Sequence, residues 1–384
     1  MIKSIFQEKH RDPSCSARTG LISLPHGDVQ TPAFMPVGTN ATVKAVEPRD
    51  LESMGFSLIL SNTYHLFLRP GPEVISKAGG LHGFSGWQRN FLTDSGGFQI
   101  FSLSQFRKIL DDGVRFRSHI DGSSHILTPE NVVDIQTAFN SDIQMALDIC
   151  APWGESENKA YKATALTYDW AKRAKTQWLS QRERGYQGYL FGIVQGNFYR
   201  ELRKMSVEQI ASLDLPGIAI GGLSIGEPKE AYMEYLDFTA ALLPSDKPRY
   251  IMGIGTPDYI IEAVRNGIDI FDCVYPTRTA RNGLLFTSRG QIVIKKAIYK
   301  KDFRPIDTDC SCRVCKTYSR AYLHHLFRNN EILYSMLASQ HNLHFMADFA
   351  SKIRQAIQED GFESFARAFL DRYTGMEEKE EAQE

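Results

Sequence analysis

The chain has 384 residues, of which 42% are hydrophobic and 23% charged, a composition typical of an ordinary folded protein. Its formal net charge of −1 excludes a strong overall positive field of the kind that attracts nucleic acid. No apolar run reaches the roughly 18 residues of a membrane span, and no signal peptide opens the chain. We therefore expect a cytoplasmic protein that does not bind membranes and whose cysteines are reduced.

The first predicted element is a hairpin over residues 17–33 that turns at Gly27. Eight short apolar runs follow, and most of the gaps between them hold helix signals. The runs occupy residues 34–38, 58–62, 91–94, 143–148, 190–196, 218–222, 250–253 and 268–272. Strands that alternate with helices form parallel βαβ units, so eight of them predict an α/β protein built as a (β/α)8 TIM barrel, with the hairpin at its bottom. A doubly wound sheet is the alternative that counting alone leaves open.

Two local signals lie between the third and fourth predicted strands. Residues 114–127 alternate in polarity and turn at Asp121-Gly122, a pair typical of a type I′ hairpin. The Thr-Pro-Glu run at residues 128–130 supplies an N-cap, a first-turn proline and a first-turn acid, which predicts that a helix begins there.

A basic segment follows the eighth strand. Between Pro276 and Arg304 the chain carries eight Lys or Arg side chains against one acid, Asp302. Such a segment is typical of phosphate binding. A solvated protein face is the alternative interpretation.

A cysteine cluster comes next in the chain. Cys310, Cys312 and Cys315 with His341 make the tetrahedral ligand set that zinc prefers. Because four protein ligands leave no open position, we expect one structural zinc ion per chain. The histidines that compete with His341 for the fourth place are His324, His325 and His344.

These patterns divide the chain into four predicted segments. Residues 1–294 form the barrel with its hairpin, residues 295–350 the zinc-binding subdomain, and residues 351–373 a final helix that packs back on the barrel. Residues 374–384 form an acidic tail that we expect to be disordered.

Polar residues end several of the predicted strands, namely Asn62, Asp94, Asp148, Gln195 and Asp272. The C-terminal ends of the strands carry the active site in a (β/α)8 barrel. We therefore expect these side chains to converge on one pocket, although any one of them alone can be a turn cap.

Asp272 and Asp94 are the candidate carboxylate pair. Displacement at an anomeric carbon uses one carboxylate as nucleophile and a second group to transfer protons. Asp272 precedes Arg278 and Arg281, which can bind phosphate. Asp94 precedes a Gly-Gly turn and Phe98, and a flat base can approach the backbone closely there. A plain turn is the alternative for the Asp94 motif.

Asp148 and Gln195 are suited to binding a purine. A carboxylate can accept two N–H bonds from an amidine edge, and an amide can donate to a ring carbonyl. The backbone N–H groups after Gly221 can bind the same carbonyl. Cys150 and Cys273 lie nearby without a histidine base, so we interpret both as packing residues.

Taken together, these motifs resemble the tRNA-guanine transglycosylase family in its bacterial, queuine-type form. The resemblance covers almost the whole chain and rests on residues 61–65, 94–99, 192–196, 221–227, 252–255 and 271–283 and on the cysteine cluster. It implies a barrel with an inserted C-terminal zinc-binding subdomain, and a pentosyltransferase of queuosine biosynthesis. This enzyme exchanges the wobble guanine of tRNAs with a G-U-N anticodon for 7-aminomethyl-7-deazaguanine, by double displacement through a covalent tRNA intermediate.

The resemblance also implies a role for each matching residue. Asp272 is the nucleophile, and Asp94 transfers protons. The base stacks between Phe98 and Met252, and its predicted contacts are Asp94, Ser95, Gly96, Gly97, Phe98, Asp148, Gln195, Gly222, Leu223 and Met252. The predicted tRNA contacts are Gly253, Ile254, Gly255, Thr256, Pro257, Asp258, Tyr259, Thr277, Arg278, Thr279, Ala280 and Arg281. Zinc is bound by Cys310, Cys312, Cys315 and His341.

Two further implications concern the base and the partners. Ile225 keeps the pocket narrow, which favours the aminomethyl base, and full queuine is the alternative. The family is typically a homodimer, with aromatic interface positions at Phe84, Tyr318, Tyr322 and His325. One rival function is a non-catalytic tRNA-binding subunit, which the intact Asp272 and Asp94 argue against. The other is a glycoside hydrolase, which would carry sugar-binding tryptophans in its loops, whereas this chain has only four tryptophans in all.

Overall fold

The computed structural model describes residues 4–103 and 107–374. Its main sheet consists of eight strands, each of which overlaps one predicted run. They are β4 (Ala33–Pro36), β5 (Leu58–Ser61), β6 (Asn90–Thr93), β10 (Ile143–Met145), β11 (Tyr189–Val194), β12 (Gly217–Ile220), β13 (Arg249–Ile251) and β14 (Ile270–Cys273).

The sheet closes into a barrel. Its strand order is β4-β14-β13-β12-β11-β10-β6-β5, and all the paired neighbours are parallel. A parallel bridge between Val37 and Leu60 joins the ends of β4 and β5. The (β/α)8 barrel is therefore confirmed, and the open doubly wound sheet is excluded.

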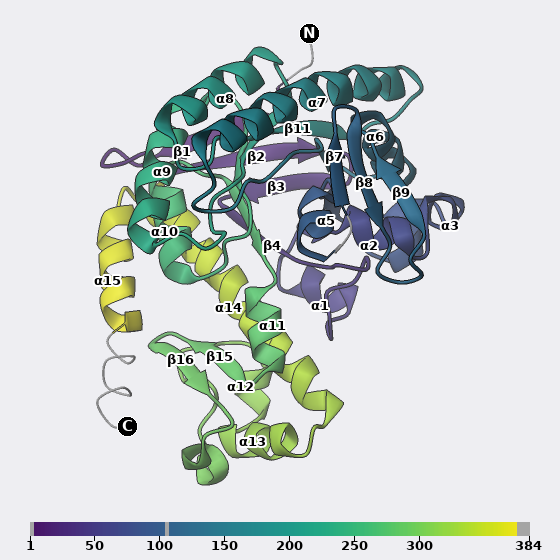
Figure 1. Ribbon diagram of the computed structural model, residues 1–384. Coiled ribbons are helices and arrows are strands. Elements are labelled where there is room, and N and C mark those ends of the chain that lie inside the picture. Colours follow the sequence, from purple (N-terminus) through teal and green to yellow (C-terminus); the bar gives the residue numbers. More distant parts are fainter. Residues whose placement is uncertain (1–3, 104–106, 375–384) are drawn as a thin grey trace.

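Helices surround this barrel (Figure 1). They are α1 (Pro48–Ser53), α2 (Thr63–Leu68), α3 (Pro72–Lys77), α4 (Gly80–Ser85), α5 (Gly97–Leu103), α6 (Pro129–Ala138), α7 (Glu157–Glu183), α8 (Arg200–Ser212), α9 (Lys229–Leu242), α10 (Pro257–Arg265) and α11 (Tyr275–Arg281). The predicted helix start at α6 is confirmed, because Thr128 and Asn131 each accept a hydrogen bond from the other's backbone N–H.

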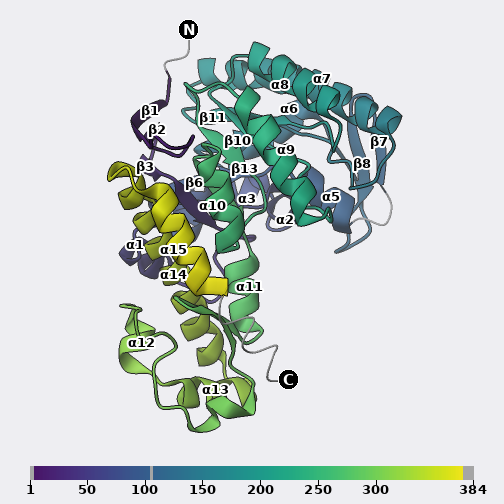
Figure 2. The same cartoon turned by 90° about the vertical axis from the view of Figure 1, so that its left-hand side faces the viewer.

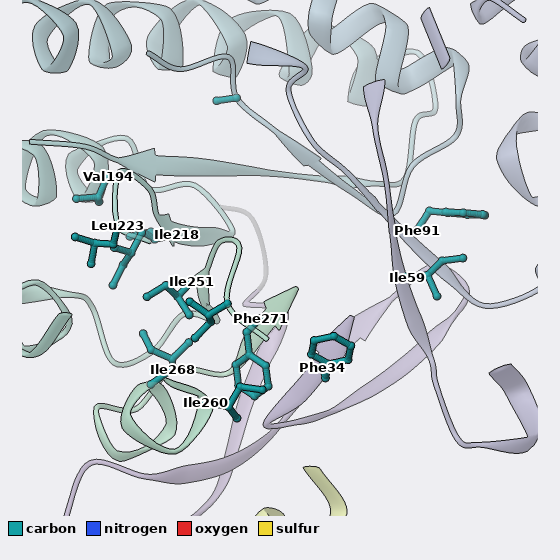
Figure 3. Close-up of a cluster of buried hydrophobic side chains, with 14 of the residues drawn as sticks. Phe34, Ile59, Phe91, Val194, Ile218, Leu223, Ile251, Ile260, Ile268 and Phe271 are labelled. Atoms are coloured by element: carbon teal, nitrogen blue, oxygen red, sulfur yellow. The ribbon is translucent and has the colours of Figure 1, made fainter. Parts of the chain in front are cut away.

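Alternate residues of the strands pack into two apolar layers. Phe34 and Phe271 lie side by side and face the helices (Figure 3), whereas Met35 and Ile270 face the barrel interior. The interior cluster also contains residues of β1 (Phe6–Arg11), β2 (Arg18–Leu24) and β3 (Gly27–Thr31). This antiparallel sheet therefore plugs the barrel, as the hairpin prediction expected. Strand β1 was not predicted, because its polar sequence lacks apolar alternation.

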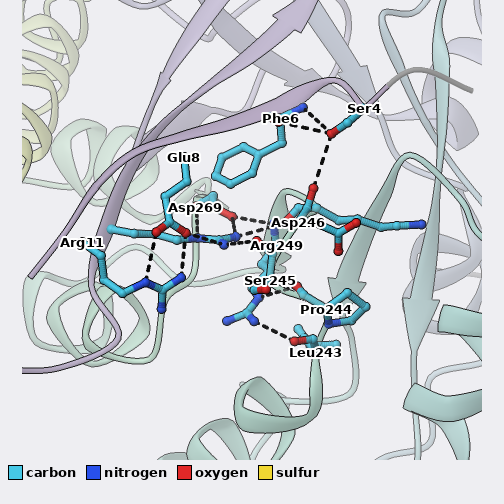
Figure 4. Close-up of polar contacts among 12 residues, drawn as sticks. Ser4, Phe6, Glu8, Arg11, Leu243, Pro244, Ser245, Asp246, Arg249 and Asp269 are labelled. Carbon is cyan, nitrogen blue, oxygen red and sulfur yellow. Dashed lines mark hydrogen bonds and ion pairs between the residues drawn. The ribbon is translucent and has the colours of Figure 1, made fainter.

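A buried ion pair joins the plug to the barrel, and Figure 4 shows its carboxylate, Asp269, beside Arg249. Arg18 and Asp269 are both fully buried, and their Nη2 and Oδ2 atoms lie 2.6 Å apart. Asp269 Oδ2 also accepts the backbone N–H of Arg249 at 2.7 Å. Since Asp269 immediately precedes β14, these contacts join β2 to β13 and to the start of β14. Breaking the buried pair would leave an uncompensated charge.

A second small sheet consists of β7 (Arg107–Leu110), β8 (Gly113–Arg117) and β9 (Ser124–Leu127). The predicted hairpin is present, but its turn is not type I′. That turn needs positive φ at both central residues, and of the pair only Gly122 has it, at +74°. The loop is longer, and Asp121 Oδ1 holds it by accepting the Ser123 N–H at 3.2 Å.

The C-terminal elements begin beyond the end of the barrel that lies away from α7 and α8, and the last of them packs back on the main core (Figures 1 and 2). They are β15 (Leu284–Thr287), β16 (Gly290–Val293), η1 (Ala297–Lys301), α12 (Arg313–Thr317), α13 (Arg320–Arg328), α14 (Ile332–Gln358) and α15 (Phe362–Thr374). Helix α14 runs from this end to the barrel, so it connects the two parts.

The helix expected over residues 351–373 is in fact the end of α14 followed by α15. The chain turns between them at Asp360, whose φ is +56°, and Gly361. Leu285 and Ile292 share a core with Val314, so the packing of the zinc-binding part begins before residue 295. The four-segment division itself stays a prediction, and residues 375–384 of its acidic tail lie outside the described residues.

None of the helices in the described ranges combines the length and the apolarity needed to cross a membrane.

Candidate active site and metal centre

A cavity of about 690 Å³ opens at the C-terminal ends of the barrel strands. Both predicted catalytic carboxylates line it. So do the predicted base contacts Ser95, Phe98, Asp148, Gln195, Gly222, Leu223 and Met252. Gly96 and Gly97 do not line the cavity but shape the turn behind it. The convergence expected from the strand ends is therefore present in the structure.

Asp94 is held at the end of β6 by four donors. Oδ1 accepts the backbone N–H groups of Thr63 at 2.8 Å and Gly96 at 3.2 Å, and Oδ2 accepts the amides of Gln99 at 2.8 Å and Asn62. Burial raises the pKa of Asp94 to about 6, against the effect of these donors. A carboxyl group with this pKa can both release and take up a proton near neutral pH.

Gly96 is required at this turn. Its φ is +79°, which disfavours any other residue, and a Cβ there would lie 3.2 Å from the backbone nitrogen of Tyr64. The turn therefore brings the Gly96 N–H close enough to orient the Asp94 carboxylate.

Asp272 lies one residue before the end of β14 and lines the same cavity. Its Oδ1 accepts the hydroxyl of Tyr250 at 2.5 Å and the backbone N–H of Gly253 at 3.0 Å. Burial raises the pKa of Asp272, whereas these two donors lower it. Among the described residues no side chain or backbone N–H bonds to Oδ2, so this oxygen is available to a ligand in the cavity.

Tyr250 lines the cavity and is a site residue that sequence reasoning missed. It pairs in register with Ile270, and Asp272 lies two residues further along β14, so both side chains point to the barrel interior. The signal was present in the sequence, because Tyr250 lies two residues before the predicted base contact Met252 and alternation places both on one face.

Asp148 and Gln195 form a buried pair at the floor of the cavity. Gln195 Nε2 donates to Asp148 Oδ2 at 2.7 Å, and Ser95 Oγ lies 3.3 Å from Oδ1. Burial raises the pKa of Asp148 to about 6. The two side chains therefore line the cavity in one fixed arrangement.

Asp148→Asn should make stability less sensitive to pH. The carboxyl pKa is about 6 in the fold and about 3.8 when unfolded, so the stability that Asp148 contributes is complete below about pH 4 and is lost as pH rises through 6. In urea unfolding, the free energy of unfolding of the variant relative to that of wild type should rise by about 1–2 kcal/mol from about pH 5 to pH 8. Asp28→Asn, at an exposed position, is the control, and an equal gain there would contradict the assignment to burial.

The backbone around Gly222 is fixed from behind by Arg203. This guanidinium is fully buried, and it donates to the carbonyl oxygens of Gly221 at 2.7 Å and Gly222 at 3.1 Å. On the far side of the loop the N–H groups of Ser224 and Ile225 donate to the Glu227 carboxylate. Sequence reasoning missed Arg203, since an arginine in a helix ordinarily indicates a solvated face.

Phe98 and Met252 line the cavity from α5 and from the residue after β13, and the Phe98 side chain is 52% exposed. Ile225 lines it as well. Burial raises the thiol pKa of Cys150 to about 12 and of Cys273 to about 11. Neither thiol is therefore ionised at neutral pH, which agrees with a packing role.

The predicted tRNA contacts differ in their exposure. Gly253 is exposed, and four others are partly buried, namely Thr256, Asp258, Tyr259 and Thr279. Arg278 is exposed on α11, and both Arg278 and Arg281 line the rim of the cavity. In contrast, the side chains or Cα atoms of five predicted contacts are buried, namely Ile254, Gly255, Pro257, Thr277 and Ala280. Of these five, Thr277 lines the cavity, as Gly253 also does, whereas the other four present little surface. Lys44, which was not predicted, lines the same cavity.

The cysteine cluster is assembled around His341. Its Nδ1 lies 3.4 Å from the Sγ atoms of Cys312 and Cys315 and 3.9 Å from that of Cys310. Its Nε2 lies 2.7 Å from the carbonyl oxygen of Phe286, so Nε2 carries the proton and Nδ1 is left to bind a metal. The four residues can therefore hold one metal ion.

The competing histidines have other contacts. The Nδ1 of His324 lies 2.8 Å from the Ile294 carbonyl oxygen, and the Nε2 of His344 lies 3.3 Å from Ser311 Oγ. His325 contacts Asn329. The structure thus brings His341 and none of these three to the cysteines.

Comparison with known proteins places the chain in a family. A family model described as queuine tRNA-ribosyltransferase matches residues 12–375. The queuine tRNA-ribosyltransferase of Treponema denticola is 59% identical over 97% of this chain and 98% of its own length. Those of Caldanaerobacter subterraneus and Borrelia duttonii are 52% and 53% identical over 97% and 96% of this chain and 99% and 98% of theirs. Since these matches span nearly the whole chain, it belongs to the queuine tRNA-ribosyltransferase family, the tRNA-guanine transglycosylase family that its motifs resemble.

Proposed function

We propose that the protein exchanges the wobble guanine of tRNAs with a G-U-N anticodon for 7-aminomethyl-7-deazaguanine. The observation that carries this proposal is the meeting of Asp272 and Asp94 in one cavity whose floor holds the Asp148–Gln195 pair. Two carboxylates are suited to catalysing displacement at a sugar, and the buried Asp148 carboxylate and Gln195 amide are suited to binding a purine-like base.

The reaction then has two displacement steps. Asp272 Oδ2 attacks C1′ of the ribose, the C1′–N9 bond breaks, and the departing guanine takes up a proton that Asp94 supplies. The incoming base returns a proton to Asp94 as its N9 attacks C1′, and Asp272 leaves as a carboxylate. Two inversions give overall retention. The raised pKa of Asp94 suits a group that is protonated in one step and ionised in the other.

The base has to leave the anticodon stack to reach this cavity. Enzymes that act on a base commonly flip it into a pocket, and unpaired loops are where RNA sequence is usually read. Phe98 and Met252 would hold the flipped ring between them, and Arg278, Arg281 and Lys44 would bind phosphates at the rim. Ile225 would narrow the pocket in favour of the aminomethyl base, with queuine as the alternative.

The metal that suits Cys310, Cys312, Cys315 and His341 is zinc, because three thiolates and one imidazole match its ligand preference. With all four positions filled by protein, the ion would stabilise the fold and take no part in the chemistry. We also propose that the protein acts in the cytoplasm as a homodimer. Exposed aromatic side chains at Phe84 and Tyr322 are in keeping with an interface there.

One assay tests the exchange function. The holoprotein is incubated with radiolabelled guanine and unmodified tRNA bearing a G-U-N anticodon, and label in the tRNA is counted. Incorporation without ATP supports the proposal. If protein that retains its zinc binds the tRNA but incorporates no label, it would instead be a non-catalytic tRNA-binding subunit.

Arg278→Ala should weaken tRNA binding and flatten its salt dependence, because each lost phosphate contact lowers the slope of log K against log salt by about 0.7–0.9. Arg278 is exposed at the rim and not on the floor of the cavity. Free-base affinity should therefore stay within about twofold, because substitutions at distant sites affect each other little. Equal loss of both affinities would place Arg278 in the base pocket.

A further inference from the structure

A second cluster of metal-ligating side chains lies at the opposite end of the barrel. His26 comes from the turn between β2 and β3, His82 from α4, and Asp142 from the residue just before β10. The active-site cavity opens at the C-terminal strand ends, whereas Asp142 precedes the N-terminal end of its strand. The function proposed above makes no use of these three residues.

The three side chains converge on a small volume. His26 Nδ1 lies 2.6 Å from Asp142 Oδ1, and His82 Nε2 lies 3.3 Å from Asp142 Oδ2. The two imidazole rings stack with their centroids 3.6 Å apart. All three ligand atoms lie within 4.8 Å of one another. A tetrahedral ion with bonds of about 2.0–2.1 Å separates its ligand atoms by roughly 3.4 Å. Of the two contacts to Asp142, only the shorter one, from His26, would therefore have to lengthen for an ion to bind.

His82 points to a missing partner. Its side chain is 7% exposed, and within the described residues neither ring nitrogen has a partner in hydrogen-bond geometry. A buried polar group without a partner destabilises the fold. The 3.3 Å contact with Asp142 has the spacing of two ligands of one ion but not the geometry of a hydrogen bond.

Asp142 has the environment of a ligand whose charge a cation would balance. The carboxylate is buried and accepts the backbone N–H of Phe91 at 2.7 Å, which fixes its orientation. Among the ion pairs of the described ranges, only the two histidines are its partners. His26 is partly exposed, with 31% of its side chain accessible, so an ion can enter from solvent.

We propose that His26, His82 and Asp142 form a second site for a divalent metal of the zinc class. Two imidazoles and one carboxylate suit such an ion, and water would complete its coordination. Because the ligands come from the plug, α4 and the barrel wall, the bound ion would tie the N-terminal sheet to the barrel. The inference does not depend on the exchange reaction.

The test is the number of zinc ions per chain. Holoprotein is dialysed against micromolar zinc near pH 7.5, where an ordinary imidazole is about 90% neutral, and metal is measured against protein concentration. We expect two ions per chain in wild type and one in His26→Gln. The retained ion should be the one at the cysteine cluster, since His26→Gln leaves those ligands unchanged.

His10→Gln is the matched control. His10 also pairs with an aspartate, its Nε2 lying 2.7 Å from Asp360 Oδ1, but it belongs to no three-ligand group in the described part of the chain. This variant should keep two ions. Since His26 lies in a turn, His26→Gln should fold, and circular dichroism checks this; Asp142→Asn provides a second variant that should also retain one ion.

Two results would overturn the proposal. The first is one ion per chain in wild type under the same dialysis, whatever the variants do. The second is two ions in every variant, which would assign the extra zinc to another part of the surface. Thermal unfolding gives an independent readout, because added zinc should raise the melting temperature of wild type and His10→Gln but not of His26→Gln.

Discussion

Asp272→Asn is expected to abolish the covalent tRNA adduct and to lower the exchange rate by about 10⁴-fold or more, the scale seen when a catalytic nucleophile is removed. An amide at this position has no charge with which to attack C1′. The fold should survive, because the amide oxygen can still accept the Tyr250 hydroxyl and the Gly253 N–H. A denaturing gel of protein mixed with tRNA measures the adduct directly.

Tyr250→Phe separates the charge of Asp272 from its orientation. The variant keeps the carboxylate but removes a donor that lowers its pKa, so the pKa of Asp272 should rise. The adduct should still form, while the acid limb of the kcat/KM profile should move to higher pH. An adduct that persists in Asp272→Asn, or an unchanged pH profile in Tyr250→Phe, would show that Asp272 is not the attacking group.

The barrel and the floor of its cavity were predictable for a physical reason. Buried parallel strands require short apolar runs, and the polar residue that ends each run lies at the strand end where the cavity opens. Asp94, Asp148 and Asp272 were found in this way, without knowledge of the packing between them. The cysteine spacing was equally informative, because few other structures require three thiols and a histidine together.

What the sequence did not reveal depends on contacts between distant segments. Arg203 resembles a surface residue until its helix packs behind Gly221. Strand β1 has a polar sequence and is a strand only because β2 lies beside it. The loop after β8 is held by Asp121 side-chain bonds, which override the preference of an Asp-Gly pair for a two-residue turn. In each case tertiary or side-chain contacts decide against the local signal.

His341→Ala is expected to release the metal and to unfold the C-terminal part of the protein. Structural zinc contributes roughly 10–16 kcal/mol of apparent binding energy in small domains, so losing one ligand should remove several kcal/mol. The core around Val314 and Leu323 is small and separate from that of the barrel, which leaves it dependent on the metal. Zinc content and the rate of limited proteolysis after residue 284 are the measurements.

His344→Ala is the control for this variant, because His344 lies less than one turn away on α14 and contacts Ser311, not the cysteines. It should keep its zinc and its resistance to protease. If both histidine variants retain the metal, the fourth ligand is wrong; if both lose it, the effect belongs to helix α14 and not to coordination.

Loss of the metal should also affect the proposed tRNA-binding rim of the cavity, because α14 holds α11 in place. Asn342, next to His341, donates to the carbonyl oxygens of Pro276 at 2.9 Å and Leu284 at 3.1 Å, and Tyr334 donates to that of Ala280 at 2.9 Å. These bonds position the helix that carries Arg278. The floor of the base pocket is attached to other strands. His341→Ala should therefore lower tRNA affinity by about tenfold or more, while free-base affinity falls little. Equal loss of both affinities would show that the metal stabilises the whole barrel.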